Sequence, residues 1–129
     1  GVRLVGSEMC IRDSHIHLPA WLKKAVLECD WRRETWHEVA CYYYRQHEWE
    51  LCFAHCVTAM SLGRTRVHSD VDENAILAEL NDMAAMSAWN CGMLDKAVIF
   101  AESATNLAPR DARLQNNLIT IKNIIANKK

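Results

Sequence analysis

The sequence has few of the residues that break helices. Its 129 residues include four glycines and two prolines, which disfavours the many turns of a strand-based fold and favours long helices. Half of the residues are apolar or aromatic, and the length is enough for one domain with a single core. We therefore expect one all-α domain.

An excess of charge of one sign is also missing. Lys and Arg together number 15, and Asp and Glu number 16. A balanced surface lacks the long-range field that draws proteins to nucleic acids or anionic membranes. No apolar run approaches the ~20 residues of a membrane span, and the order of residues typical of a signal peptide is missing. We therefore expect no nucleic-acid partner, no membrane partner and a cytoplasmic location.

The motifs of common catalytic sites are missing as well. The sequence has no Gly-rich phosphate loop, no Cys-x-x-Cys pair and no nucleophile with an adjacent base at local spacing. The single Asp-x-Asp string, Asp70-Val71-Asp72, lies at the expected start of a helix, where a carboxylate can cap free N–H groups. We therefore expect no catalytic residue and no cofactor in this segment.

The segment from Gly1 to Ser14, GVRLVGSEMCIRDS, has neither helical nor strand periodicity. It resembles the translated read-through of a sequencing adapter that recurs at the ends of open reading frames from environmental assemblies. This resemblance implies that residues 1–17 are an artefactual or disordered leader outside the folded domain. It also implies that a domain upstream of His15 is missing and that the chain is a fragment.

In the rest of the chain, apolar residues recur at helical spacing. A short helix follows Pro19, one helix pair turns near His47, a second pair turns at Gly92 and ends before Pro109, and Asp111 caps a last helix. This predicts about six helices. The expected domain, 18–127, consists of an incomplete unit at 18–30, a unit at 33–63, a loop at 64–71, a unit at 72–109 and a capping helix at 111–127.

Small residues recur in the two helix pairs at a constant offset of 45 residues. The matching sets are Ala40, Cys52, Cys56 and Ala59 in the first pair and Ala85, Ala97, Ala101 and Ala104 in the second. Without the eleven residues from Arg64 to Asn74 the period is 34 residues. A period of this length is typical of helical hairpins that stack into a superhelical array.

The first pair also has a characteristic spacing of large and small residues. The positions concerned are Trp36, Val39, Ala40 and Tyr43 in the first helix and Cys52 and Ala59 in the second. This pattern resembles the tetratricopeptide repeat (TPR), which implies antiparallel helix pairs whose backbones approach to ~8 Å where small residues meet. The second unit has Asn81 and Ala88 where Trp and Tyr are usual, so thinner packing against the preceding unit is expected.

A narrower resemblance covers about Arg32 to Ile121. Four strings carry it: Arg-Arg-Glu-x-Trp, Tyr-Tyr-x-x-x-x-x-Trp, Asn-Asp-Met-Ala-Ala, and Leu-Ala-Pro-Arg-Asp-Ala-Arg-Leu-Gln-Asn-Asn. They are similar to the helical tail that follows many bacterial and phage family 2 glycosyltransferase domains, although that tail often has Pro where this chain has Thr35. The resemblance implies a non-catalytic scaffold within a larger glycosyltransferase-like protein.

A free-standing adaptor that binds a peptide is the alternative. The first helices of stacked units line a concave face, and aromatic residues on such a face can anchor a peptide. The candidate binding residues are His37, Cys41, Tyr44, Arg45, Asp82, Met86, Trp89 and Asn116. The partner is then a protein or peptide, or the missing upstream domain.

A zinc site is the third hypothesis. His37 and Cys41 are four residues apart, as are Cys52 and Cys56, and this spacing suits ligands on a helix. Cys52 and Cys56, however, occupy positions where the repeat requires small residues, and a free Cys packs as a small hydrophobe. We therefore favour the packing interpretation and predict no metal site.

Overall fold

The structure is a computed structural model that describes residues 18–62 and 73–128. In these ranges the chain forms α2 (Ala20–Glu28), α3 (Arg33–Arg45), α4 (Trp49–Ser61), α5 (Glu73–Asn90), α6 (Leu94–Leu107) and α7 (Ala112–Asn127). No strand occurs within them, so the predicted all-α class with about six helices is confirmed. The leader at 1–17 and the loop at 64–71 lie outside the described residues.

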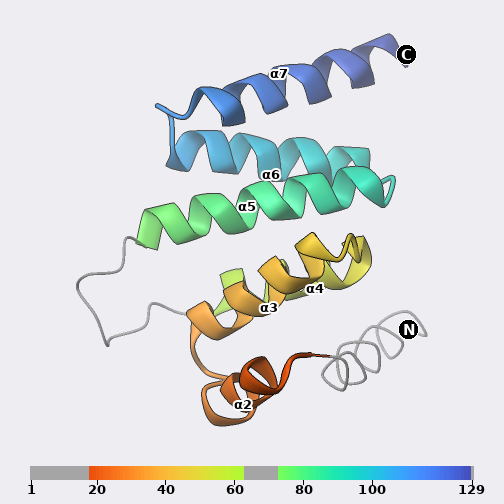
Figure 1. The fold of residues 1–129 in the computed structure, drawn as a ribbon. Coiled ribbons are helices and arrows are strands. Elements are labelled where there is room, and N and C mark those ends of the chain that lie inside the picture. The colour runs from red at the N-terminus through yellow and green to blue at the C-terminus, as the bar shows by residue number, and fades with distance from the viewer. Residues whose placement is uncertain (1–17, 63–72, 129) are drawn as a thin grey trace.

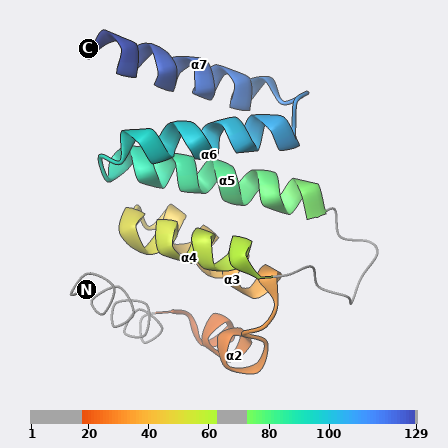
Figure 2. The same ribbon diagram turned by 180° about the vertical axis from the view of Figure 1, so that it is seen from behind.

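The helices stack in layers from α2 at one end to α7 at the other (Figure 1, Figure 2). Helix α3 packs against α4, and α5 packs against α6, each pair joined by a tight turn. Helix α4 also packs on α5, while α3 contacts α5 directly. The first helices of the two pairs are therefore neighbours, and their side chains can share one face.

The repeated small residues lie inside the stack. All eight positions that share the 45-residue offset are buried, with exposed fractions of 5% or less. On α3 the predicted apolar face is buried too; its members are Trp36, Val39, Ala40 and Tyr43. Ala and Cys at these positions leave little between the backbones, so the helices can approach closely.

The core is uneven along the stack. The larger cluster joins α2, α3 and α4 to the side chains of Leu80 and Met83 on α5, whereas the smaller one contains Ala85, Ala101 and Ile121. The second unit was expected to pack thinly against the first. Leu80 and Met83 of α5 belong to the larger cluster and pack toward the first unit, while the smaller cluster lies between α5, α6 and α7.

The turns within the two pairs have the same backbone geometry. Gly92 has a φ of 79° and His47, which precedes it by the repeat offset, has a φ of 58°. In both turns the next amide donates to a carbonyl five residues earlier, at 2.8 Å and 3.0 Å. The turn predicted at Gly92 is therefore confirmed, and His47 takes the same left-handed conformation without being glycine. Its ring stacks on Trp49 with centroids 5.2 Å apart.

Arg33 connects three helices from a buried position. Its Nε donates to the Ala59 carbonyl at 3.1 Å, its Nη2 donates to the Leu62 carbonyl, and its Nη1 pairs with the Glu73 carboxylate at 2.6 Å. The two carbonyls lie at the end of α4, where helical carbonyls have no helical partner and the dipole favours a cation. One side chain thus ties the start of α3 to the end of α4 and the start of α5.

The ends of the last two helices follow the sequence. Helix α6 stops before Pro109, and the Asp111 carboxylate accepts a hydrogen bond from the Arg113 amide at 3.0 Å, so the predicted cap is confirmed. None of the helices in the described ranges combines the length and the apolar character that crossing a bilayer requires.

The small positions can be tested by enlarging them. Ala40→Leu and Ala85→Leu each add three carbons where the helices meet, and we expect each to lower the free energy of unfolding by about 1–3 kcal/mol through overpacking. Ala126→Leu, at an exposed position of α7, is the control and should change little. Urea unfolding followed by circular dichroism measures all three, and losses no larger than the control's would contradict close helix approach.

Candidate functional site

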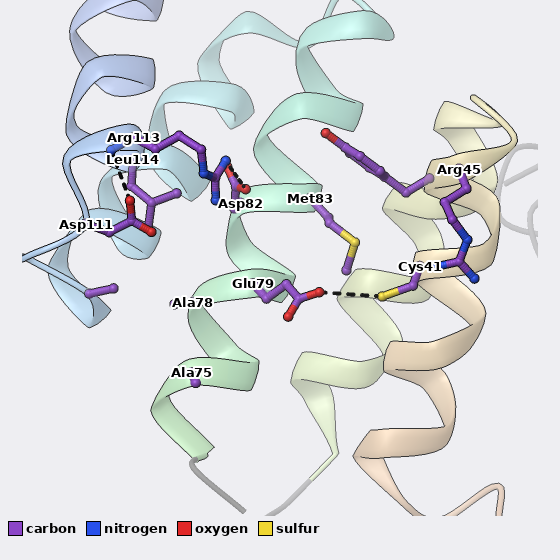
Figure 3. A pocket seen from close by; sticks show the side chains of 12 residues that line it. Cys41, Arg45, Ala75, Ala78, Glu79, Asp82, Met83, Asp111, Arg113 and Leu114 are labelled. Atoms are coloured by element: carbon purple, nitrogen blue, oxygen red, sulfur yellow. Dashed lines mark hydrogen bonds and ion pairs between the residues drawn. The ribbon is translucent and has the colours of Figure 1, made fainter.

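A groove of about 500 Å³ opens between α3, α5 and the start of α7 (Figure 3). Its floor includes Met83 and Leu114, while the polar side chains come from all three helices. This volume is within the ~300–1,000 Å³ range of ligand sites. The polar lining residues are Cys41, Tyr44 and Arg45 on α3, Glu79 and Asp82 on α5, and Asp111 and Arg113 at the start of α7.

The structure brings together about half of the predicted concave-face residues. The residues that line this groove are Cys41, Tyr44, Arg45 and Asp82. His37 lies beside it, with its Nε2 3.6 Å from Cys41 Sγ. The first helices of the two units therefore both contribute side chains to this groove.

The remaining three candidates lie elsewhere. Met86 and Trp89 line a second groove of about 120 Å³ between α5 and α7. Asn116 is exposed on α7 and lines neither groove, whereas its neighbour Asn117 lines the second one. Successive helical residues point about 100° apart, so an error of one residue in the phase of α7 turns the side chain away.

An ion pair links the two sides of the main groove. Arg113 Nη1 on α7 lies 3.0 Å from Asp82 Oδ2 on α5, and the hydrogen bond to this carboxylate raises the pKa of Arg113. The Arg113 side chain is 63% exposed and that of Asp82 13%, so we expect a small contribution to stability from this pair. Its position matters more, because it places a guanidinium at the rim of the groove.

The charge of Asp82 also acts on the hydroxyl of Tyr44. Partial burial first, and then the charge of Asp82, raise the pKa of Tyr44 above its ordinary value. The phenol therefore stays protonated at neutral pH. A protonated phenol can donate one hydrogen bond and accept another, so Tyr44 offers the groove a polar anchor on an aromatic ring.

Cys41 lies at the centre of a close group of three polar side chains. Its Sγ is 3.7 Å from Glu79 Oε1, and Glu79 Oε1 is 3.3 Å from His37 Nε2. Figure 3 shows Glu79 and Cys41 pointing toward each other between α5 and α3. Burial first, then the carboxylates of Glu79 and Glu38, raise the pKa of the Cys41 thiol to about 12, with Arg45 opposing.

Cys52 and Cys56 are separate from this group. Both are fully buried on α4, and their thiols lie close enough to alter each other's pKa. The pKa of Cys56 is raised because its thiol hydrogen-bonds to Cys52 and because it is buried, while the hydrogen bond from Cys56 lowers the pKa of Cys52. The two cysteines thus pack in the core, which agrees with the packing interpretation.

Glu79, which lines the groove, and His55, which lies in the core, were not identified from the sequence. Glu79 is 38 residues from Cys41 in the chain, so no local spacing indicated their contact. His55 is fully buried, stacks between Trp36 and Tyr43 with centroids 5.7 Å and 5.3 Å away, and bonds through Nδ1 to the Leu51 carbonyl at 2.7 Å. The signal that could have identified His55 from the sequence was its position on the apolar, buried face of α4.

No protein-family model matches this chain, and no curated protein matches it.

The influence of Glu79 on Cys41 can be measured. Glu79→Gln removes a negative charge and a hydrogen-bond partner of the thiol, so the pKa of Cys41 should fall. The thiolate fraction at pH 8 rises about tenfold for each unit of that fall, and alkylation speeds up accordingly. Iodoacetamide labelling followed by peptide mass spectrometry gives the rate at Cys41. Glu102→Gln on α6 is the control, and equal rates in both variants would rule out the proposed influence.

Proposed function

We propose that this chain is a non-catalytic, TPR-like helical scaffold that binds a segment of another polypeptide in the groove between α3, α5 and α7. The observation that carries the proposal is the groove itself, which is lined by residues from the first helices of both units and from the helix that follows them. In stacked helical repeats this concave face is the usual binding surface.

The lining favours a polypeptide over a small apolar ligand. Guanidinium groups of Arg45 and Arg113 and carboxylates of Glu79 and Asp82 surround an apolar floor. An extended chain offers amide groups, charged side chains and apolar side chains at regular spacing, and each can meet a counterpart here. Tyr44 and the two arginines are the residue types that most often dominate such interfaces.

The protonation of the groove residues supports a non-catalytic role. A nucleophilic cysteine needs a lowered pKa, but burial and acidic neighbours raise that of Cys41 to about 12. The pKa of Tyr44 is raised as well, and the Asp82 carboxylate is paired with Arg113. These groups are suited to holding a partner by hydrogen bonds and charge.

Exposed apolar residues at the α2 end of the stack support the proposal that this chain is part of a larger protein. Trp21, Leu27 and Trp31 are exposed there by 59%, 83% and 56%, whereas the terminal units of helical repeats normally present a polar face. Leu22 and Val26 of α2 are instead buried in the larger core cluster. In the proposed arrangement, an upstream catalytic domain of a family 2 glycosyltransferase-like protein covers this end.

A cytoplasmic location is part of the proposal. The five cysteines of the described ranges are all free thiols, and free thiols are typical of proteins in a reducing compartment.

Peptide selection tests the groove. Phage-displayed random peptides are selected on the purified chain, and the affinities of the enriched peptides are measured by fluorescence anisotropy. Tyr44→Ala and Arg45→Glu should each weaken binding by about tenfold or more, the loss typical of a central interface residue. Lys24→Glu, exposed on α2, is the matched charge-changing control. Enriched peptides that bind all variants equally would place the binding site outside the groove.

The DNA sequence upstream of this chain tests whether the chain belongs to a larger protein. Extending the source DNA beyond the codon for His15 should reveal an open frame that encodes a strand-rich nucleotide-sugar domain. A stop codon shortly upstream would eliminate the glycosyltransferase-like parent and leave the free-standing peptide-binding adaptor.

A further inference from the structure

His37, Cys41 and Glu79 present three ligand atoms to one another at the edge of the main groove. The distances are 3.6 Å from His37 Nε2 to Cys41 Sγ, 3.7 Å from Cys41 Sγ to Glu79 Oε1, and 3.3 Å from His37 Nε2 to Glu79 Oε1. Within residues 18–62 and 73–128, this is the one group of three or more His, Cys, Asp or Glu side chains that lie so close together.

These three distances match the edges of a zinc coordination tetrahedron. With Zn–S near ~2.3 Å and Zn–N and Zn–O near ~2.0 Å, tetrahedral angles place sulfur about 3.5–3.6 Å from nitrogen or oxygen. The same geometry places nitrogen about 3.3 Å from oxygen. A single ion can therefore contact all three atoms with little movement of the side chains.

The chemical nature of the three ligand atoms favours some metal ions over others. A thiolate and an imidazole disfavour Mg²⁺ and Ca²⁺, which are held by oxygen atoms. A thiolate, an imidazole and a carboxylate in tetrahedral arrangement are typical of Zn²⁺. Three protein ligands also leave one position open, as in sites where zinc carries a water molecule.

The surroundings favour a cation and allow it to enter. The carboxylates of Glu79 and Glu38 both act on Cys41, and the charge of Arg45 opposes them. The side chain of Glu79 is 55% exposed and that of His37 is 14% exposed, so one ligand is open to solvent while another is held in the stack. His37 and Cys41 are one turn apart on α3, which fixes their separation without any loop.

We propose that His37, Cys41 and Glu79 form a zinc site that joins the first helices of the two units. On binding, Zn²⁺ replaces the proton of the Cys41 thiol, which passes to the buffer, and the sulfur, the His37 Nε2 and a Glu79 oxygen become ligands. Water completes the fourth position. This inference does not rest on peptide binding, because the site lies between α3 and α5 whether or not the groove holds a partner.

The site differs from the zinc hypothesis raised by the sequence. That hypothesis combined His37 and Cys41 with Cys52 and Cys56, which are fully buried in the core. The third ligand comes instead from α5, through the contact between the first helices of the two units.

Cobalt binding to the purified full chain tests the proposal. Co²⁺ reports a thiolate ligand by charge-transfer absorption in the near ultraviolet, and a four-coordinate site by intense visible bands. Because Cys10, His15 and His17 are also possible ligands, the background protein is Cys10→Ser, His15→Asn and His17→Asn. We expect one equivalent of Co²⁺ to produce both signals and Zn²⁺ to displace it.

Single substitutions in this background assign the ligands. Cys41→Ser should abolish the charge-transfer band. Substitutions outside the first coordination shell typically weaken metal binding by about 10- to 100-fold. Glu79→Gln alters a ligand itself and should weaken binding by more than that. Cys29→Ser and Cys91→Ser are matched cysteine controls and should leave the spectrum unchanged. A missing band in the background protein, a band that survives Cys41→Ser, or unchanged affinity in Glu79→Gln would each overturn the site.

Stability gives an independent readout. A metal that links α3 to α5 in the folded chain raises the midpoint of thermal unfolding by mass action. Zinc should therefore raise the midpoint of the background protein but not that of Glu79→Gln, whose substituted side chain is more than half exposed and whose folding should be unaffected. Equal shifts in the two proteins would place bound zinc elsewhere.

Discussion

Close approach between helices at small side chains is the constraint on which this structure depends. Eight Ala and Cys residues, at equivalent places in the two helix pairs, are buried where the helices meet. Larger side chains there would separate the backbones, and the stacked layers would lose their contacts together. Because the small residues alternate with large ones such as Val39, Tyr43 and Leu80, the core remains filled.

Stacking of this kind also forms the groove between the two units. When α4 packs on α5, the preceding helix α3 comes beside α5, and the outer side chains of these two helices share one face. Arg33 supports the arrangement by tying the end of α4 to the start of α5. The three-ligand group and one side of the groove lie along this junction, and the Arg113–Asp82 ion pair joins α5 to α7 on the other side of the groove. A polypeptide bound there and a metal ion at its edge would both bridge the two units.

The local sequence was sufficient to predict the helices and where they end. Helical periodicity, Pro109, Gly92 and Asp111 mark helix ends and caps that depend on neighbours a few residues away, and the structure has them where they were predicted. The constant offset of the small residues indicated which faces are buried. The left-handed turn at His47 was less evident, because histidine adopts this conformation only where the surrounding turn requires it.

The composition of the groove was decided by tertiary structure. Sequence spacing identified Cys41, Tyr44, Arg45 and Asp82 as residues of one face, but it placed Asn116 there in error, since the phase of α7 depends on how that helix packs against its neighbours. Glu79 could not be paired with Cys41 from the sequence, because the two are joined only through the stacking of α3 on α5. Local interactions repeat along the chain and can be recognised in it, whereas the distance between two side chains on different helices is set by every contact that holds those helices together.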